Sequence, residues 1–213
     1  MNACTLPALR VVILAAGFSS RLGRPKALVR VRGTSLLRRT LTLTARFTAT
    51  PIIVVVPRAS ARYRTEARGF AVSFAANPQR ALGLSSSVRR GVEAGRHSPA
   101  LLLLPVDLAE LRPRDIARLI SRWRGARRRL VARCVAGSGV TARGGAPLIL
   151  PRWLYPRACE TAGDVGLRGL AGALPPARRV FLNLPSGELD IDTPQDLRAA
   201  YDKVPDTAYS REL

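Results

Sequence analysis

Short apolar segments, expected to be strands, alternate along this chain with segments expected to be helices. The expected strands are residues 11–15, 51–57, 71–76, 100–106, 130–135, 147–150 and 179–183. The expected helices are residues 35–46, 60–68, 85–95, 113–124, 154–161, 165–174 and 194–203. This order predicts an α/β fold: a mostly parallel sheet with helices on both faces.

The first apolar segment runs directly into a loop of small residues, within residues 13–26. Gly17 and Gly23 allow a tight turn whose N–H groups point toward an anion, and Ser19 adds a hydroxyl donor. The loop ends in three cations, Arg21, Arg24 and Lys26. Lys26 is one of two lysines among 35 basic residues, and an ammonium is a compact, mobile partner for phosphate. The segment therefore predicts a phosphate-binding loop.

This loop differs from the two common nucleotide-binding fingerprints. Five residues separate Gly17 from Gly23, where a Walker loop has four, and the dinucleotide pattern Gly-x-Gly-x-x-Gly is absent. The loop instead resembles Leu-Ala-Ala-Gly-x-Ser-x-Arg-x-Gly-x-x-Lys of nucleotidyltransferases related to the molybdenum cofactor enzymes. The matching residues are Leu14, Ala15, Ala16, Gly17, Ser19, Arg21, Gly23 and Lys26.

Composition indicates one compact domain with an anionic small-molecule substrate. The chain has 213 residues, of which 47% are hydrophobic, enough for a single α/β core. The net charge of +21 comes from arginines scattered along every segment, and aromatic residues make up only 5%. Too few aromatics are present for a base-stacking platform, so we expect no nucleic-acid partner. The charge favours steering of anionic substrates.

Cysteine content and hydropathy predict a cytoplasmic protein. The three cysteines, Cys4, Cys134 and Cys159, are an odd number without Cys-x-x-Cys spacing, so neither a disulfide framework nor a zinc site is expected. A reducing compartment fits best. The longest apolar stretch, residues 99–106, is far shorter than the roughly 20 residues of a membrane span, so no membrane partner is expected.

Carboxylates follow two of the expected strands. Asp107 ends the apolar run 101–106 and is the first aspartate in the chain. Alternation along an extended segment puts Asp190 and Asp192 on one side, where both can face one ion. Such hard oxygen ligands suit Mg²⁺ bridging nucleotide phosphates. Each group taken alone is also explained by capping of a turn or helix, but together with the loop they predict a Mg²⁺ site of Asp107 with Asp190 or Asp192.

A polar turn at residues 77–87 opens a helix and is expected to face the nucleobase. Asn77 offers both a donor and an acceptor to a base edge. Gly83, Ser85 and Ser87 place backbone N–H groups and hydroxyls at the helix N-terminus, where simple capping explains the serines equally well. The last helix has the best start signal, with Thr193 as cap and Asp196 at the third helical position.

The order of motifs along nearly the whole chain resembles the molybdenum cofactor cytidylyltransferases of the MobA-like NTP transferase family. Besides the loop and Asp107, the motifs are Asn-Pro-x-x-x-x-Gly-Leu-x-x-Ser at 77–87, Gly-x-Pro at 145–147, Gly-Asp-x-Gly at 163–166 and Leu-Asp-Ile-Asp-Thr-Pro-x-Asp-Leu at 189–197. The resemblance implies one Rossmann-like nucleotidyltransferase domain over 1–213. Its nucleotide-binding part is about 8–110, and its acceptor-binding and second metal-ligand part is about 111–203.

The resemblance also implies substrates, cofactor and residue roles. CTP is the expected nucleotide donor, Mg²⁺ the cofactor, and the terminal phosphate of molybdopterin the acceptor. A molybdenum hydroxylase or its maturation factor is the expected protein partner. The implied nucleotide-binding residues are Leu14, Ala15, Ala16, Gly17, Ser19, Arg21, Lys26, Asn77, Gly83, Ser85 and Ser87. The implied acceptor-binding residues are Gly145, Pro147, Asp164 and Gly166.

The expected chemistry is in-line attack by an acceptor phosphate oxygen on the α-phosphorus of CTP, with diphosphate leaving. Arg21, Lys26 and Asp107 are the expected catalytic residues. Three alternatives stay open. The first is a guanylyltransferase of this fold, which usually carries Gly-Gly in place of Ala16-Gly17. The second is a sugar- or alditol-phosphate nucleotidyltransferase, which shares the chemistry. The third is a nucleotide- or nucleic-acid-binding module without catalysis. The departures Leu-Ala-Glu after Asp107 and the residues 140–144 lie toward the acceptor.

Overall fold

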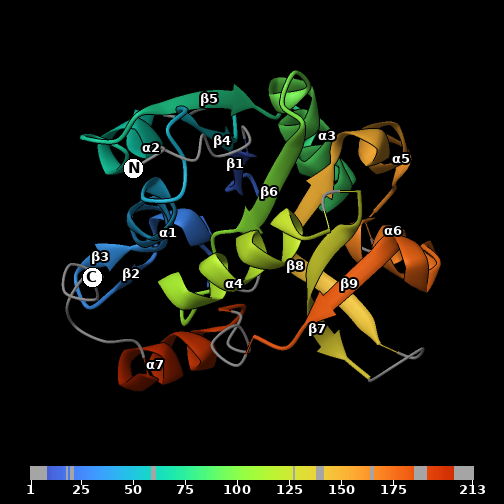
Figure 1. Cartoon of the computed structure of the whole chain (residues 1–213). Helices are drawn as coiled ribbons and strands as arrows, with labels where there is room; N and C mark the ends of the chain where they lie inside the picture. Colours follow the sequence, from blue (N-terminus) through green and yellow to red (C-terminus); the bar gives the residue numbers. More distant parts are fainter. Residues whose placement is uncertain are drawn as a thin grey trace, which may run out of the picture.

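The computed structural model describes residues 9–17, 19, 22–58, 61–126, 128–137, 142–163, 166–184 and 191–203. A seven-stranded sheet runs through the molecule in the order β5-β4-β1-β6-β8-β7-β9 (Figure 1). Its strands are β1 (Leu9–Leu14), β4 (Ile52–Val56), β5 (Val72–Ala76), β6 (Ala100–Pro105), β7 (Leu130–Ala136), β8 (Arg143–Pro151) and β9 (Arg179–Leu182). Only the two pairings of β8, with β6 and with β7, are antiparallel. The predicted mostly parallel sheet is confirmed.

Helices cover both faces of this sheet, as the sequence predicts (Figure 1). One face carries α1 (Leu36–Ala45), α2 (Ala61–Glu66), α4 (Pro113–Arg124) and α7 (Pro194–Lys203). The other face carries α3 (Leu84–Gly95), α5 (Tyr155–Glu160) and α6 (Gly166–Ala173). Short 3-10 helices are η2 (Lys26–Leu28), η3 (Arg80–Leu82), η5 (Arg152–Leu154) and η6 (Pro176–Arg178).

The two cores follow directly from the alternation of side chains along the central strands. In β1, Val11 and Ile13 enter the core under α1 and α4, whereas Val12 and Leu14 enter the core under α3. Successive strand residues point to opposite faces, so a strand buried on both faces must be apolar at every position. This explains why the central strands are continuous apolar runs.

Helix α3 lies unusually close to the sheet. A Cβ added at Gly91 would stand 2.6 Å from Cγ1 of Val12, which no ordinary side-chain contact allows. Glycine at this position therefore lets the helix backbone approach β1. The close approach also brings the first turn of α3 beside the carboxyl end of β1.

The sequence did not predict a small hairpin of β2 (Arg30–Val31) and β3 (Thr34–Ser35). Two residues with positive φ, Arg32 and Gly33, form its turn. Each strand has two residues, too few for an alternating pattern to be visible. Among the described residues, no helix is both long and apolar enough to cross a membrane.

The sheet order creates a crevice beside β1. From β1 the chain moves to β4 and β5 on one side and then returns to β6 on the other side. Such a reversal leaves a gap outside the carboxyl ends of the two strands where the direction changes, and ligands of open α/β sheets bind there. The loop after β1 and Asp107 after β6 both lie at this point.

Candidate active site

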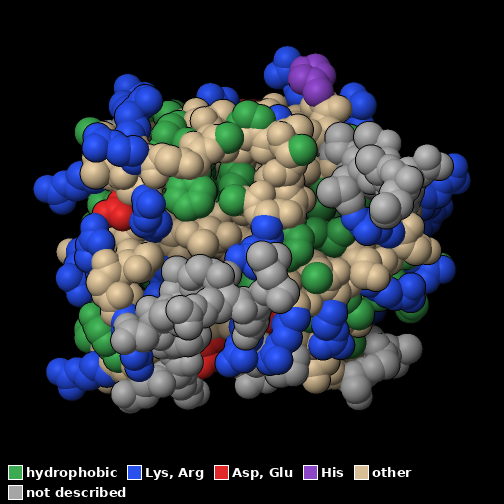
Figure 2. All heavy atoms as spheres, turned by 60° about the vertical axis from the view of Figure 1, so that its left-hand side comes forward, with side chains coloured by type: hydrophobic (Ala, Val, Ile, Leu, Met, Phe, Trp, Pro, Cys, Tyr) green, Lys and Arg blue, Asp and Glu red, His purple; other side chains and the backbone are tan. Residues whose placement is uncertain are grey.

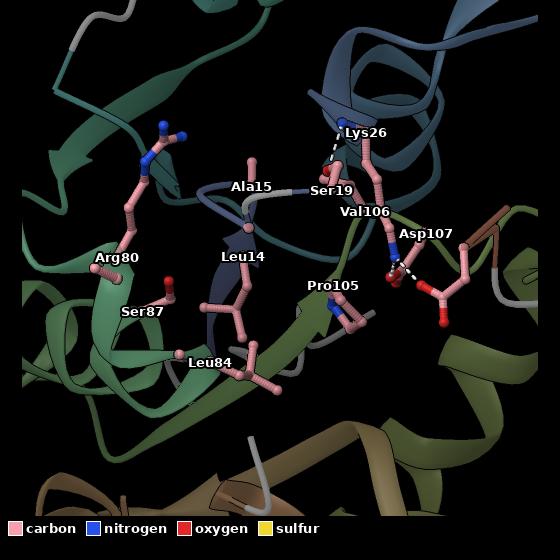
Figure 3. A pocket seen from close by; sticks show the side chains of 14 residues that line it. Leu14, Ala15, Ser19, Lys26, Arg80, Leu84, Ser87, Pro105, Val106 and Asp107 are labelled. Atoms are coloured by element: carbon pink, nitrogen blue, oxygen red, sulfur yellow. Dashed lines mark hydrogen bonds and ion pairs between the residues drawn. The ribbon is translucent and has the colours of Figure 1, made fainter. Parts of the chain in front are cut away.

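A cavity of about 380 Å³ opens at this crevice (Figure 3). Six segments line it: the end of β1, the loop that follows, η2, the stretch from η3 into α3, the end of β6, and one residue before α7. The lining residues are Leu14, Ala15, Gly17, Ser19, Lys26, Arg80, Ala81, Gly83, Leu84, Ser87, Pro105, Val106, Asp107 and Asp192. Nine of these were predicted from the sequence, and they come together here from distant positions.

The predicted phosphate-binding loop is closed by a hydrogen bond across it. The Lys26 backbone N–H donates to Ser19 Oγ over 2.9 Å, and Ser19 itself has a positive φ of 54°. The Ser19 hydroxyl oxygen thus accepts inside the loop, at the wall of the cavity. Arg21, the predicted catalytic arginine of this loop, lies outside the described residues.

Lys26 joins the two predicted metal-ligand segments. Its ammonium donates to Asp107 Oδ2 over 2.8 Å and also contacts Asp192 Oδ1 (Figure 3). Burial alone would lower the pKa of Lys26, but the charges and hydrogen bonds of the two carboxylates outweigh it and raise the pKa above its usual value. Lys26 is therefore protonated at neutral pH. One cation between two carboxylates forms the charged end of the cavity.

The backbone around Asp192 holds this carboxylate near Asp107. The Ile191 N–H donates to the Asp107 carbonyl oxygen over 3.2 Å. Asp196 Oδ2 accepts from the N–H groups of Asp192 and Thr193, and the Asp196 N–H donates to Thr193 Oγ1 over 3.2 Å. This reciprocal arrangement confirms the predicted helix start. The hydrogen bond from the Thr193 hydroxyl, with those from the two N–H groups, lowers the pKa of Asp196.

The opposite end of the cavity is formed by η3 and the first turn of α3. Arg80, Leu84 and Ser87 lie there, across from Lys26 and Asp107 (Figure 3). Gly83 joins η3 to α3 with a φ of 84°, a conformation that side chains disfavour. Of these residues, Arg80 and Leu84 were missed by the sequence prediction. Arg80 stands at a variable position of the 77–87 motif, whereas Leu84 is the leucine of that motif, to which no role in the site was assigned.

Asn77 differs from its predicted place against the nucleobase. It is buried, it is absent from the cavity lining, and its amide is engaged inside the protein. The reason is local: the Asn-Pro turn folds the amide back onto the start of α3. Ser85 donates to the Leu82 carbonyl oxygen and also lies outside the lining. Ala16 is buried in the core under α3 and does not line the cavity either.

The predicted acceptor-binding residues lie on the neighbouring part of the sheet. Gly145 and Pro147 are in β8, and Gly166 begins α6. None of these three residues lines the cavity described above. A Cβ at Gly145 would stand 2.8 Å from Cγ1 of Val135, so close packing already requires glycine there. Asp164 and Asp190 lie outside the described residues.

On the face seen in Figure 2, positive charge is spread out rather than gathered in one band. Figure 2 shows Lys and Arg side chains distributed around the edges and lower part of the face in view, with few Asp or Glu side chains among them. A field of this kind attracts anions from several directions. It is consistent with steering of a polyphosphate toward the cavity.

The fold is that of α/β nucleotidyltransferases. The MobA-like NTP transferase domain matches residues 11–178, and the chain belongs to that family. The family membership confirms the resemblance seen in the motifs. No curated protein sequence matches the chain.

Solved structures of the same fold cover nearly the whole chain. Rv0371c from Mycobacterium tuberculosis H37Rv is 25% identical, with 92% of this chain and 100% of that chain covered and a TM-score of 0.71; it has also been solved as a manganese complex. 2-C-methyl-D-erythritol 4-phosphate cytidylyltransferase from Thermus thermophilus is 22% identical over 91% and 97%, with a TM-score of 0.64. Molybdopterin-guanine dinucleotide biosynthesis protein A from Archaeoglobus fulgidus is 16% identical over 91% and 97%, with a TM-score of 0.65.

Proposed function

We propose that this protein transfers CMP from CTP to the terminal phosphate of molybdopterin and releases diphosphate. The observation that carries the proposal is the Lys26 ammonium held between Asp107 and Asp192 at one end of the cavity. Nucleotidyl transfer needs a cation for the triphosphate and carboxylates for a metal at one point, and these three side chains supply both. Membership of the MobA-like NTP transferase family supports the same reaction class.

The two carboxylates fit Mg²⁺ carried in by a nucleotide. They converge on a single cation, Lys26, so both can reach one positive centre. Mg²⁺ in such sites takes one or two protein carboxylates and completes its coordination with phosphate oxygens and water. No cluster of three or more potential metal ligands occurs within the described residues, which agrees with a metal that depends on the nucleotide. Asp190 stays a predicted alternative to Asp192, and the manganese complex of Rv0371c supports a divalent ion in this fold.

The residues of the chain then account for each part of the transfer. The loop N–H groups and Ser19 orient the triphosphate, and Lys26 and Arg21 neutralise charge on its β- and γ-phosphates. An acceptor phosphate oxygen forms a bond to the α-phosphorus while the bond to the β-phosphate oxygen breaks, so diphosphate leaves with the electron pair. Mg²⁺, when bound, stabilises negative charge on the α-phosphate. The acceptor phosphate is already ionised at neutral pH, so no base is needed.

The acceptor is assigned to the second part of the sheet. Gly145 and Pro147 lie in β8, which pairs with β6, and Asp107 follows the end of β6. Gly166 begins α6, which packs against β8. We propose that these residues, with Asp164, bind the molybdopterin phosphate. A molybdenum hydroxylase or its maturation factor is the proposed partner that receives the product. The neighbours act on different substrates by name, one a methylerythritol phosphate cytidylyltransferase and one a molybdopterin-guanine dinucleotide protein, so the acceptor needs a direct test.

Diphosphate release from each nucleotide and acceptor pair tests the proposal. Purified protein is incubated with Mg²⁺, one of the four NTPs, and either molybdopterin, a sugar phosphate or an alditol phosphate. We expect release with CTP and molybdopterin, and loss of release in Asp107→Asn. Release with GTP, or with a sugar or alditol phosphate, would assign the reaction to that substrate instead. No release from any pair would contradict the proposed activity.

A further inference from the structure

Lys26 and a bridging divalent metal ion would use the same carboxylate oxygens. The ammonium donates to Asp107 Oδ2 over 2.8 Å and also contacts Asp192 Oδ1 (Figure 3). Mg²⁺ binds carboxylate oxygens at about 2.0–2.1 Å. An ion that bridges the two oxygens converging on Lys26 would therefore stand at the position of the ammonium, whose like charge also repels it. The two cations exclude each other at this point.

The Lys26 ammonium, more than lack of access, separates these carboxylates from a cation in solution. The Asp192 side chain is 40% exposed, so a hydrated ion can approach it, whereas the Lys26 side chain is only 17% exposed. Solvent and salt screen an ion pair of such low exposure less than a pair on the surface. A divalent ion must therefore compete with a cation that both carboxylates already hold.

The backbone of Lys26 is held in place, so its side chain is the part that can move. The Lys26 N–H donates to Ser19 Oγ over 2.9 Å, and its carbonyl oxygen accepts from the Val29 N–H over 2.9 Å. The four-carbon stem of a lysine is flexible, and Lys26 lines the cavity. Rotation of this stem can carry the ammonium from the carboxylates into the cavity while the backbone of η2 stays in place.

A triphosphate is a ligand that can accept this ammonium. The step rests on the proposed function, in which Lys26 neutralises charge on the β- and γ-phosphates. An ammonium has three N–H donors, so Lys26 could also reach a phosphate with its third donor and stay on both carboxylates. The carboxylates would then remain closed to metal. If the ammonium leaves them instead, it gains phosphate oxygens while the Mg²⁺ of the nucleotide gains the carboxylates.

We propose that Lys26 occupies the metal position between Asp107 and Asp192 in the nucleotide-free protein, and that it leaves this position when a triphosphate accepts its ammonium. The protein alone then binds divalent ions weakly, whereas nucleotide and metal enter together and each strengthens binding of the other. Such coupling between two ligands is reciprocal. Lys26 is thus both a contact of the nucleotide and the residue that prevents metal binding without it.

Binding of Mn²⁺ to nucleotide-free protein, followed by the electron paramagnetic resonance signal of free Mn²⁺, tests whether Lys26 excludes metal. Lys26→Met keeps a long side chain and removes the charge, and its thioether is a poor ligand for a metal that prefers oxygen. We expect the Mn²⁺ dissociation constant to fall by about tenfold or more. Adding Asp107→Asn to Lys26→Met should abolish this gain, because the gain requires the carboxylate.

Two matched variants separate occupancy of the metal position from a change in total charge. Lys26→Arg keeps a cation beside the same carboxylates, so its Mn²⁺ affinity should stay within about threefold of wild type. Arg80→Met removes one positive charge from the opposite end of the cavity and should also change the affinity by less than about threefold. Circular dichroism verifies that each variant is folded.

The lysine signals in nuclear magnetic resonance report on the ammonium of Lys26 itself. The chain has only two lysines, Lys26 and Lys203, so protein labelled with ¹³C and ¹⁵N in lysine gives two sets of side-chain signals. Lys203→Arg removes one set and thereby identifies that of Lys26. We expect Mg²⁺ alone to leave the Lys26 signal in place, and the same concentration of Mg²⁺ with CTP to shift it.

Titration calorimetry of CTP binding separates departure of the ammonium from contact through its third donor. If Lys26 leaves the carboxylates, Asp107 binds metal, so Asp107→Asn should weaken CTP binding by about tenfold or more with Mg²⁺. Without Mg²⁺ the same variant removes one negative charge and should bind CTP at least as tightly as wild type. If Lys26 stays on both carboxylates, the effect of Asp107→Asn is the same with and without Mg²⁺, and the inference is wrong.

The remaining outcomes separate this inference from the proposed function. The inference is overturned if wild type and a folded Lys26→Met variant bind Mn²⁺ equally, if Arg80→Met gains as much, or if Mg²⁺ alone shifts the Lys26 signal. Diphosphate release then decides nucleotidyl transfer independently. If Lys26→Met does not fold, the lysine signals and the calorimetry of Asp107→Asn decide the inference. If no NTP binds, the proposed function fails, whereas the Mn²⁺ comparison still decides whether Lys26 excludes metal.

Discussion

The two ends of the cavity are assembled in different ways. The charged end joins Lys26 to Asp107, 81 residues away, and to Asp192, 166 residues away. The opposite end is formed by Arg80, Ala81, Gly83, Leu84 and Ser87, which lie in one continuous turn and the helix start that follows it. The first depends on tertiary packing and on charge, whereas the second depends on local geometry and on the direction of hydrogen bonds.

This difference predicts how each end responds to substitution. The side chains of Lys26 and Asp107 are 17% and 20% exposed, while Asp192 is 40% exposed. Solvent screens a more exposed ion pair more strongly, so Asp107 should contribute more than Asp192. Apart from Arg80, the lining residues of the opposite end are uncharged, so substitutions of Ala81 or Leu84 should affect binding of a polyphosphate less.

The largest effect is expected from Asp107→Asn, which removes a charge and preserves shape. Turnover should fall by about 100-fold or more, and Mg²⁺-dependent CTP binding should weaken, because a metal carboxylate is lost. Diphosphate release and circular dichroism measure activity and folding. Glu93→Gln removes a carboxylate of α3 that lies outside the cavity lining and should retain activity. A folded Asp107→Asn variant within about tenfold of wild type, roughly 1.4 kcal/mol in barrier, would contradict the assignment.

Lys26→Arg is the next test, because it keeps the charge and changes the head group. The planar guanidinium is larger than the ammonium held between Asp107 and Asp192 and cannot follow a phosphate in the same way. We expect turnover to fall by about tenfold to 100-fold, well beyond the loss of CTP affinity. Comparing kcat with the CTP dissociation constant measures this split. If the variant were as active as wild type, the role of Lys26 would be limited to attracting the nucleotide through its charge.

A smaller effect is expected from Ala16→Gly, which tests whether the loop itself chooses the base. A methyl group in direct contact with a base would discriminate by about 10- to 200-fold. The Ala16 side chain is instead buried in the core under α3, outside the cavity lining. The ratio of kcat/KM for CTP and GTP should therefore change by less than about tenfold. A larger change would show that the loop itself contributes to discrimination between CTP and GTP.

The smallest effect concerns Thr193→Ala, which weakens the start of α7 behind Asp192. Loss of the cap should lower the free energy of unfolding by about 1 kcal/mol, measured by urea denaturation at neutral pH. The cap lowers the pKa of Asp196, so its contribution is present above the ordinary pKa near 4 and is lost as pH falls through the lower folded value. The difference between wild type and variant should therefore shrink in acid. If the stability difference between wild type and Thr193→Ala were the same in acid as at neutral pH, the Asp196 carboxylate would not contribute to the cap.

Much of the fold could be predicted from local pattern. The helices α4 and α7 occupy the predicted residues 113–124 and 194–203, since proline at the first helical position marks both starts. The antiparallel direction of β8 was not predicted, because alternation of side chains does not reveal which way a strand runs. The β2–β3 hairpin was missed because its strands are two residues long.

The residues of the candidate site can likewise be divided into those that local pattern predicted and those that it did not. The loop after β1 and Asp107 after β6 were predictable, because a chemistry-bearing residue at the end of an apolar strand reaches the crevice of any such sheet. Asn77 was predicted at the base, but the folded turn directs its amide onto Ser86 and Ser87. Arg80 carries no distinguishing local pattern in a chain with so many arginines, so only its place on the cavity wall reveals it.

By itself the sequence determined the α/β class and singled out the loop after β1 and the carboxylates of the proposed site, because these depend on residue types over short spans. Tertiary structure alone decided that Asp192 meets Asp107 on one ammonium and that Asn77 lies behind Ser87. Both are decided by distances and by the direction of hydrogen bonds. Those arise only when β1, β6, α3 and α7 pack around a common crevice.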